Sequence, residues 1–186
     1  LFGENRVAEL LEKQQALDLP GIEWHFIGHV QRRKAKSLVG KTALIHSVDR
    51  LALAEELSNR AAAAGVTIAG LLQVNASGEE SKGGWPVFDA GGQRTFLQDV
   101  EQMLALPALS LRGLMTMAPF FEDAARAQPV FARVRALRET LRERFPEADW
   151  AILSMGMTND YPYAIAEGAT HLRIGTALFG PRDDTG

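Results

Sequence analysis

The sequence predicts an α/β fold with a parallel sheet, and two observations carry that prediction. Short apolar segments rich in branched residues alternate along the chain with longer segments whose apolar residues recur at helical spacing. Alternation of this kind with short connections is typical of βα units. The 186 residues have the length of one domain, so we expect a single core and one domain over residues 1–186.

Composition narrows the class of protein. Apolar residues make up 46% of the chain and charged residues 23%, which is typical of an ordinary globular protein and excludes a disordered one. Lys and Arg total 20 against 23 Asp and Glu, a net charge of −3, so we expect no nucleic-acid partner. No apolar run reaches the roughly 18–20 residues that span a bilayer, so we expect no membrane partner and a cytoplasmic location. The absence of cysteine excludes disulfides and cysteine nucleophiles.

The first half of the chain contains the end of one predicted strand and three complete ones. Branched and aromatic residues between turn residues indicate strands at 24–28, 43–48 and 66–75, and residues 1–5 have the character of a strand's last residues. Helical spacing predicts helices at 6–16, 31–39 and 50–64. Asp49 precedes the last of these as a candidate N-cap, and Gly65 follows its end.

The second half repeats the pattern. Strands are predicted at 111–117, 150–155 and 171–179, and helices at 95–105, 123–145 and 161–168. The long helix at 123–145 places Val130, Phe131 and Val134 on one face and ends before Pro146. Pro129 inside this segment indicates either a kink or the true start of the helix.

This alternation permits a doubly wound open sheet or a closed (β/α)8 barrel. The chain contains neither G-x-G-x-x-G nor G-x-x-x-x-G-K-[ST], so the two commonest nucleotide-binding open sheets lose support. Polar residues within or at the ends of strands favour the barrel, whose active sites lie at the carboxyl ends of its strands. These residues are His25, His46, Gln73, Asn75, Thr116, Ser154, Arg173 and Thr176. Eight strands are needed, so we expect about 40 further residues before Leu1, which makes this domain N-terminally truncated.

The ends of the last two predicted strands form a candidate phosphate site. Residues 154–160 (SMGMTND) supply hydroxyls and backbone N–H groups where a helix begins, a position that stabilises anions. Arg173, Gly175 and Thr176 follow on the last strand, where glycine lets a ligand approach and threonine can donate its hydroxyl. In barrels the loops after strands seven and eight frequently bind phosphate. A role limited to capping and turns remains the alternative.

Other polar residues each allow two interpretations. Arg173 lies between apolar neighbours and needs a partner, either a heteroatom of a ring cofactor or a carboxylate on a helix. Asn5 either offers its amide to a ligand or caps the following helix. Residues 77–84 form either a mobile lid that carries Lys82 or a solvated loop. The histidines lack metal-binding spacing, so we expect satisfied core residues and no metal.

Long blocks of the sequence resemble the pyridoxal-phosphate homeostasis protein family (the YggS/PROSC type), from Leu1 to about Arg182. The blocks include FGENRVAEL, IEWHFIGHVQRRKAK, IHSVDRLALAEEL, LLQVNASGEESKGG and LSMGMTNDYPYAIAEGATHLRIGTALFGPR. The resemblance implies a (β/α)8 TIM barrel of the alanine-racemase N-terminal type, here without its first strand and helix. It implies a monomer that binds pyridoxal 5′-phosphate, a form of vitamin B6, and acts in intracellular cofactor homeostasis. The family has no established catalytic turnover, so we expect no enzyme.

The resemblance also implies roles for individual residues. Ser154, with Met155 and Gly156 after it, would hold the cofactor phosphate together with Gly175 and Thr176. Arg173 would face the pyridine nitrogen, and Asn5 would line the site near the ring. An unprotonated pyridine is a poor electron sink, which agrees with a non-catalytic role. The family's Schiff-base lysine lies upstream of Leu1, so no catalytic residue is assigned; its position matches none of Lys13, Lys34, Lys36, Lys41 and Lys82.

Two other functions remain open. A pyridoxal-phosphate-dependent enzyme of racemase type would need a second catalytic base, commonly a tyrosine, and Tyr161 and Tyr163 both lie in the helix after SMGMTND. A barrel enzyme acting on phosphate esters without a vitamin cofactor is compatible with the phosphate loops. The predicted mouth, however, lacks a convincing pair of carboxylates for acid–base catalysis.

Overall fold

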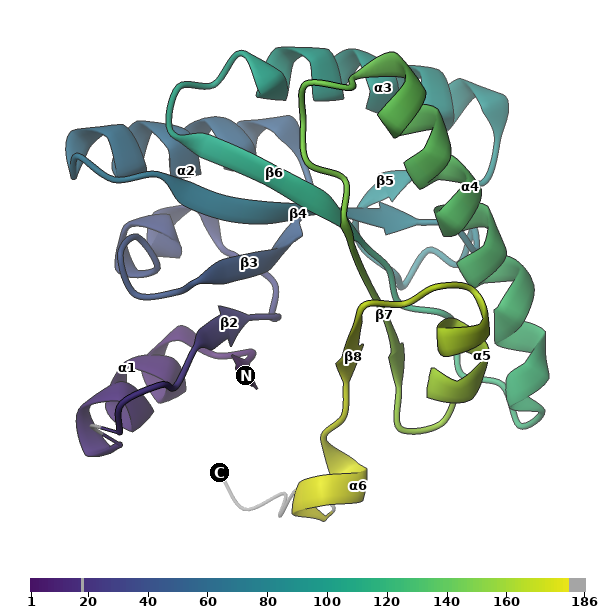
Figure 1. Cartoon of the computed structure of the whole chain (residues 1–186), viewed down its shortest axis with the longest axis horizontal. Helices are drawn as coiled ribbons and strands as arrows, with labels where there is room; N and C mark the ends of the chain where they lie inside the picture. The colour runs from purple at the N-terminus through teal and green to yellow at the C-terminus, as the bar shows by residue number, and fades with distance from the viewer. Residues whose placement is uncertain (18, 181–186) are drawn as a thin grey trace.

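The computed structural model describes residues 1–17 and 19–180, which form an incomplete barrel of parallel strands surrounded by helices (Figure 1). The strand order is β1-β2-β3-β4-β6-β7-β8, with β5 beside β4, and these pairings are parallel. The strands are β1 (Phe2–Glu4), β2 (Trp24–Phe26), β3 (Leu44–Val48), β4 (Ile68–Asn75), β5 (Trp85–Pro86), β6 (Leu109–Met115), β7 (Ile152–Met157) and β8 (His171–Arg173). The helices are α1 (Val7–Ala16), α2 (Leu51–Ala63), α3 (Ala90–Leu104), α4 (Gln128–Arg144), α5 (Tyr161–Ala166) and α6 (Thr176–Phe179), with 3₁₀ turns η1 (Arg32–Ser37) and η2 (Ala124–Ala127).

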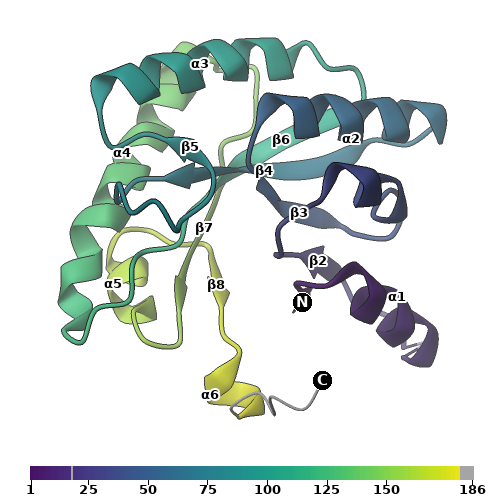
Figure 2. The same cartoon turned by 180° about the vertical axis from the view of Figure 1, so that it is seen from behind.

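The seven strands of this path confirm the predicted alternation. The helices α2, α3 and α4 lie on the outside of the sheet, while β1 and β8 lie at its two ends (Figure 2). Within the described residues, β1 pairs only with β2 and β8 only with β7, so the ring of strands is not closed by hydrogen bonds. No helix in this part of the chain is long and apolar enough to cross a membrane.

The strand predicted at 171–179 is wrong in its second half. β8 ends at Arg173, and Thr176–Phe179 form the short helix α6 with Gly175 at its N-cap. The backbone N–H groups of Leu178 and Phe179 donate to the Gly175 carbonyl oxygen at 2.9 Å. Both side chains are more than two-thirds exposed, at 72% and 75%. With no neighbouring strand to pair with in the described structure, this segment satisfies its hydrogen bonds locally instead.

Three helix boundaries also differ from the prediction. α3 begins five residues before the predicted start, because Asp89 Oδ1 accepts a hydrogen bond from Gly92 N at 2.8 Å and caps the helix. The helix predicted at 31–39 is the shorter η1, in which only Ala35 is buried. The long helix α4 begins at Gln128 rather than at residue 123, and of the two alternatives for Pro129, a kink or the true helix start, the second is confirmed.

The two faces of the sheet differ in chemistry because successive side chains of a strand point to opposite sides. The outer face is apolar and packs against the helices in one core cluster. This cluster includes Ile45, Leu72, Leu114 and Leu153 from strands with Leu57 from α2, Phe96 from α3 and Phe131 from α4. The inner face has a small apolar cluster of Leu44, Leu71 and Met115. Its remaining buried residues are mainly polar, and they build the candidate site.

Candidate functional site

Hydrogen-bonded side chains from four strands cross the inside of the barrel. Arg173 on β8 donates from Nη1 to Ser154 Oγ at 2.7 Å and from Nη2 to the Thr116 carbonyl oxygen at 2.8 Å. Ser154 Oγ on β7 lies 2.8 Å from His46 Nδ1 on β3. His46 Nε2 lies 2.9 Å from His25 Nδ1 on β2. We call His25, His46, Ser154 and Arg173 the inner polar chain.

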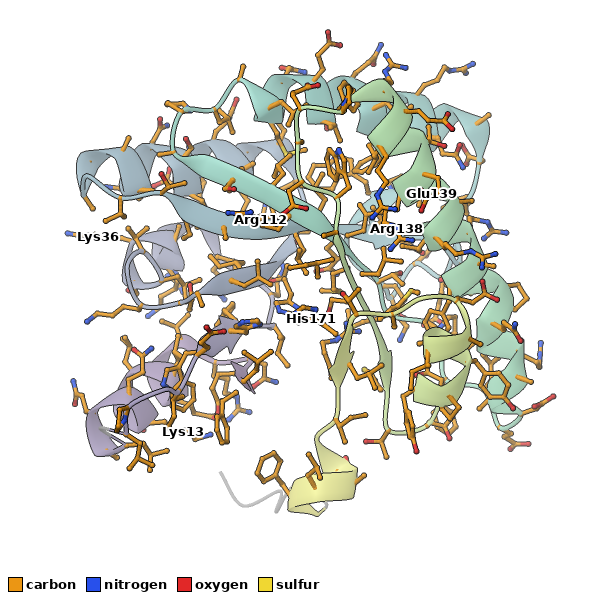
Figure 3. The ribbon with its side chains drawn as sticks, in the orientation of Figure 1. Lys13, Lys36, Arg112, Arg138, Glu139 and His171 are labelled. Carbon is orange, nitrogen blue, oxygen red and sulfur yellow. The ribbon has the colours of Figure 1, made fainter. Side chains whose placement is uncertain are left out.

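A third histidine brings the two ends of the sheet together. The ring of His171 on β8 stacks on His25 with centroids 5.9 Å apart, and its edge faces His46 at 6.1 Å. Figure 3 shows His171 directed from β8 toward the inside of the ring of strands. β2 and β8 lie far apart in the strand order. Their contact therefore shows that the sheet curls until its ends approach each other.

Burial sets the charges of this cluster. Burial, together with the neighbouring His25, Arg173 and His171, lowers the pKa of His46 to about 2. Burial also lowers the pKa values of His25 and His171. For Arg173, burial outweighs the opposite effect of Asp160, and the pKa is lowered to about 10. Near pH 7 the cluster therefore holds neutral imidazoles and one positive guanidinium.

Asp160 acts electrostatically on that guanidinium but does not form an ion pair with it in the described part of the chain. No ion pair within 4.0 Å joins Arg173 to a carboxylate of residues 1–17 or 19–180. Its predicted alternative, a salt bridge to a helix, is therefore not formed there. A desolvated cation without an anionic partner is costly, and arginine can only donate hydrogen bonds. The arrangement suits an anion or an electron-rich ring atom as a ligand.

The three candidate residues of β7 have different surroundings. Ser154 is fully buried and belongs to the inner polar chain. Met155 is fully buried in the outer core cluster. Gly156 has a φ of +93°, and a Cβ there would lie 2.7 Å from the Ala164 Cβ of α5. Close packing of α5 on β7 therefore requires glycine at this position.

The remaining candidates lie at the two ends of the sheet. Gly175 and Thr176 follow Arg173 after Ile174 and are exposed, and the space around Gly175 is open. Asn5 is partly buried after β1 and lines an open cavity of about 290 Å³ together with Phe26. Arg6, rather than Asn5, occupies the N-cap position of α1.

The loop after β4 is tied down by two amides that the sequence placed at the barrel mouth. Asn75 Nδ2 donates to the carbonyl oxygens of Glu79 and Lys82 at 2.9 and 3.0 Å. Gln73 Nε2 donates to the Gly83 carbonyl oxygen at 3.0 Å. These side chains therefore fasten the loop, and the Asn-x-x-Gly sequence at its start is a turn signal that could have indicated this.

The lysines of the described residues lie outside the inner polar chain. Lys13 donates to Glu4 Oε1 at 2.6 Å, and Lys82 Nζ lies 3.7 Å from Glu79 Oε1. Lys36 points away from the sheet in Figure 3. Lys34 and Lys41 are also exposed.

The histidines have a larger part in the candidate site than the sequence predicted. His25 and His46 are satisfied buried residues, as expected, but their connection to Ser154 and Arg173 was not predicted. Their positions in apolar strands, at inner-face register, are the signal that was available. Among the described residues no group of three or more His, Cys, Asp or Glu has an arrangement that could hold a metal ion.

The sequence and the fold were compared with those of known proteins. Residues 1–183 match the family described as "Alanine racemase, N-terminal domain". The chain is similar to the pyridoxal phosphate homeostasis proteins of Aquifex aeolicus (44% identity, 98% of this chain and 77% of the relative) and Escherichia coli K12 (37%, 98% and 76%). It is similar to the structure of PipY from Synechococcus elongatus with PLP bound, with a TM-score of 0.86, 39% identity, and coverage of 96% and 81%. An alanine racemase of Clostridium difficile in complex with cycloserine shares the fold, with a TM-score of 0.71, 16% identity, and coverage of 98% and 48%.

Proposed function

We propose that the chain, which belongs to the family of the alanine racemase N-terminal domain, binds pyridoxal 5′-phosphate and acts in intracellular homeostasis of this cofactor. The names of the pyridoxal phosphate homeostasis proteins to which it is similar support this proposal. The observation that carries the proposal is the Arg173 guanidinium, which is charged, is partly buried on the inner face and forms no ion pair within 4.0 Å with a carboxylate of the described residues. The PLP-bound structure of PipY supports the choice of ligand.

The residues present fit such a ligand. Ser154 and the Thr116 carbonyl oxygen each accept one hydrogen bond from Arg173, which leaves other guanidinium N–H groups to donate to a ligand acceptor. With a pKa of about 10, Arg173 keeps its own proton at neutral pH. It would therefore donate to the pyridine nitrogen and leave that nitrogen unprotonated. Bound pyridoxal phosphate supplies an aldehyde and an electron-accepting ring.

We assign the remaining candidates to the two ends of this ligand. Gly175 and Thr176 would hold the phosphate, since both are exposed and the space around Gly175 is open. Met155 and Gly156 would contribute through their backbone, because the Met155 side chain is buried in the outer core and Gly156 has none. Asn5 would line the site near the ring. Ser154 would act on the cofactor through its hydrogen bond with Arg173.

We propose that the protein acts without catalytic turnover, as a monomer in the cytoplasm. A pyridine nitrogen that accepts from arginine is a weak electron sink, which supports binding rather than carbanion chemistry. Size-exclusion chromatography should give one monomer peak. Exchange of the alanine α-proton well above the rate with free cofactor would favour the racemase-like function instead.

The direct test is a titration with pyridoxamine 5′-phosphate, which lacks the aldehyde and so does not react with lysines. The wild-type chain should bind it, as followed by the absorbance of the ligand. Arg173→Gln should weaken binding at least about tenfold, which corresponds to about 1.4 kcal/mol for a lost charged hydrogen bond. Arg112→Gln is the matched control, because Arg112 is half-exposed and pairs with Asp149 at 3.0 Å (Figure 3).

Two results would contradict the proposal. Equal affinities of the wild type and Arg173→Gln would remove the role of the guanidinium. Absence of binding to pyridoxal or pyridoxamine 5′-phosphate, with tight binding of a sugar phosphate, would favour the phosphate-ester enzyme.

A further inference from the structure

We propose that His46 and His25 are positioning residues, which hold the Arg173 guanidinium toward the ligand through the Ser154 hydroxyl as neutral imidazoles of one fixed tautomer. The identity of the ligand rests on the proposed function above. The hydrogen-bond geometry does not, because it is formed by this chain alone.

The direction of the hydrogen bonds in the inner polar chain is set by Arg173. A guanidinium has donors and no acceptor, so Ser154 Oγ must accept at the 2.7 Å contact. The Ser154 hydroxyl then retains a proton to donate. His46 Nδ1, at 2.8 Å, is its other hydrogen-bond partner among the described residues, and Ser154 is 0% exposed. Donation to His46 requires Nδ1 to be unprotonated and Nε2 to carry the proton.

The next contact continues in the same direction. His46 Nε2–H donates to His25 Nδ1 at 2.9 Å, so His25 also carries its proton on Nε2. The opposite direction would make Ser154 accept from both Arg173 and His46. Its own hydroxyl proton would then have no acceptor at a fully buried position, which is unfavourable. Hydrogen-bond satisfaction therefore selects the first direction.

Charge favours the same arrangement. Arg173 and the rings of His25 and His171 face His46, and each disfavours a proton on it; Glu23 acts on His25 in the opposite sense. A protonated His46 could not accept from Ser154, because both ring nitrogens would be donors. A neutral His46 therefore keeps the Ser154 oxygen oriented for Arg173.

This arrangement separates two roles that Ser154 could have. A hydroxyl that donates to His46 and accepts from Arg173 is not free to donate to a ligand phosphate. The guanidinium is then held on one side by the Thr116 backbone and on the other by an acceptor that the histidines orient. Loss of the His46 acceptor therefore affects only the contact of the guanidinium with Ser154 and leaves its hydrogen bond to the Thr116 carbonyl oxygen in place.

The first experiment is long-range ¹H–¹⁵N NMR of the histidine rings in the ligand-free chain from about pH 5.5 to about pH 8. His46, assigned by the loss of its signals in His46→Asn, should show Nδ1 unprotonated and Nε2 protonated throughout. A Nδ1–H tautomer, or titration of this ring near its ordinary pKa, overturns the proposal whatever the protein binds.

The second experiment measures affinity for pyridoxamine 5′-phosphate in variants. His46→Leu and Ser154→Ala should each weaken binding about tenfold, whereas His46→Asn, whose side-chain oxygen can accept from Ser154, should retain most of the affinity. Ser58→Ala is the control, because Ser58 is a buried hydroxyl of α2 that accepts from Ala108 N at 3.2 Å, outside the inner polar chain. It should lower the melting temperature and leave affinity unchanged.

The outcomes separate positioning from a purely structural role. If His46→Leu binds like the wild type, or if His46→Asn loses as much affinity as His46→Leu, the positioning role is wrong. If the wild type does not bind the ligand, the proposed function fails, and the NMR experiment alone decides the tautomer.

Discussion

The outer face of the sheet is joined to the helices by apolar side chains, whereas the inner face carries Arg173, Ser154, His46 and His25 in one hydrogen-bonded chain. Apolar contacts are non-directional, so the outer face tolerates many arrangements of similar volume. Buried polar groups need specific partners, so the inner face allows few. The outer face therefore supplies most of the apolar stabilisation, and the inner face carries the proposed binding site.

The largest expected loss of stability follows a substitution in the apolar core on the outer face. Phe131 on α4 is 0% exposed in the core cluster. Phe131→Ala should lower the free energy of unfolding by about 3–5 kcal/mol, because the lost ring leaves a cavity. Chemical denaturation measures this, and the ligand affinity of the folded fraction should stay the same. A loss below about 1 kcal/mol would show that α4 contributes little to the core.

The next effect is a pH dependence that arises on the inner face. The pKa of His46 falls from 6.5 to about 2 on folding, so between these values the unfolded chain binds a proton that the folded chain does not. Stability is therefore complete above about pH 6.5 and falls as the pH decreases. From about pH 7.5 to about pH 5, His46 should account for a loss of about 2 kcal/mol, with His25 and His171 acting in the same direction.

Denaturant unfolding across this pH range measures the effect. The variant His46→Asn should show a shallower pH dependence, since it lacks the titrating ring. An equally steep dependence in the variant would assign the effect to other groups.

The smallest expected effect on stability concerns Thr116, which forms one hydrogen bond through its side chain and another through its backbone. Thr116 Oγ1 donates to the Val74 carbonyl oxygen at 2.8 Å, while the Thr116 backbone oxygen accepts from Arg173. Thr116→Val should cost about 1 kcal/mol of stability through the lost hydrogen bond. Affinity for pyridoxamine 5′-phosphate should not change, because the backbone acceptor remains. A tenfold loss of affinity would show that the hydroxyl also orients the arginine.

Much of the fold was predictable because its signals are local. The periodicity of apolar residues identified the strands of the ring, and Pro129 marked the start of α4. Segments with weak tertiary support were predicted less well. The residues after Arg173 have a strand-like composition but no neighbouring strand in the described structure, and the start of α3 depends on the Asp89 cap.

Part of the candidate site was also predictable. A charged side chain in an apolar strand, such as Arg173, indicates a special environment from sequence alone. Its acceptors could not be predicted, because Ser154 is 19 residues away and the Thr116 carbonyl oxygen 57. Gln73 and Asn75 were expected as polar residues at the barrel mouth, and their hydrogen bonds to the loop after β4 depend on where that loop folds back.

The alternation of strands and helices, the apolar outer face and the identity of the polar residues inside follow from the amino-acid sequence alone. Those properties follow from the spacing of side chains along the chain, which is a local property. The contacts of Arg173 with Ser154, of Ser154 with His46 and of His25 with His171 depend on how the sheet folds in three dimensions. These contacts join strands distant in sequence, and their partners depend on the curvature and register of the sheet.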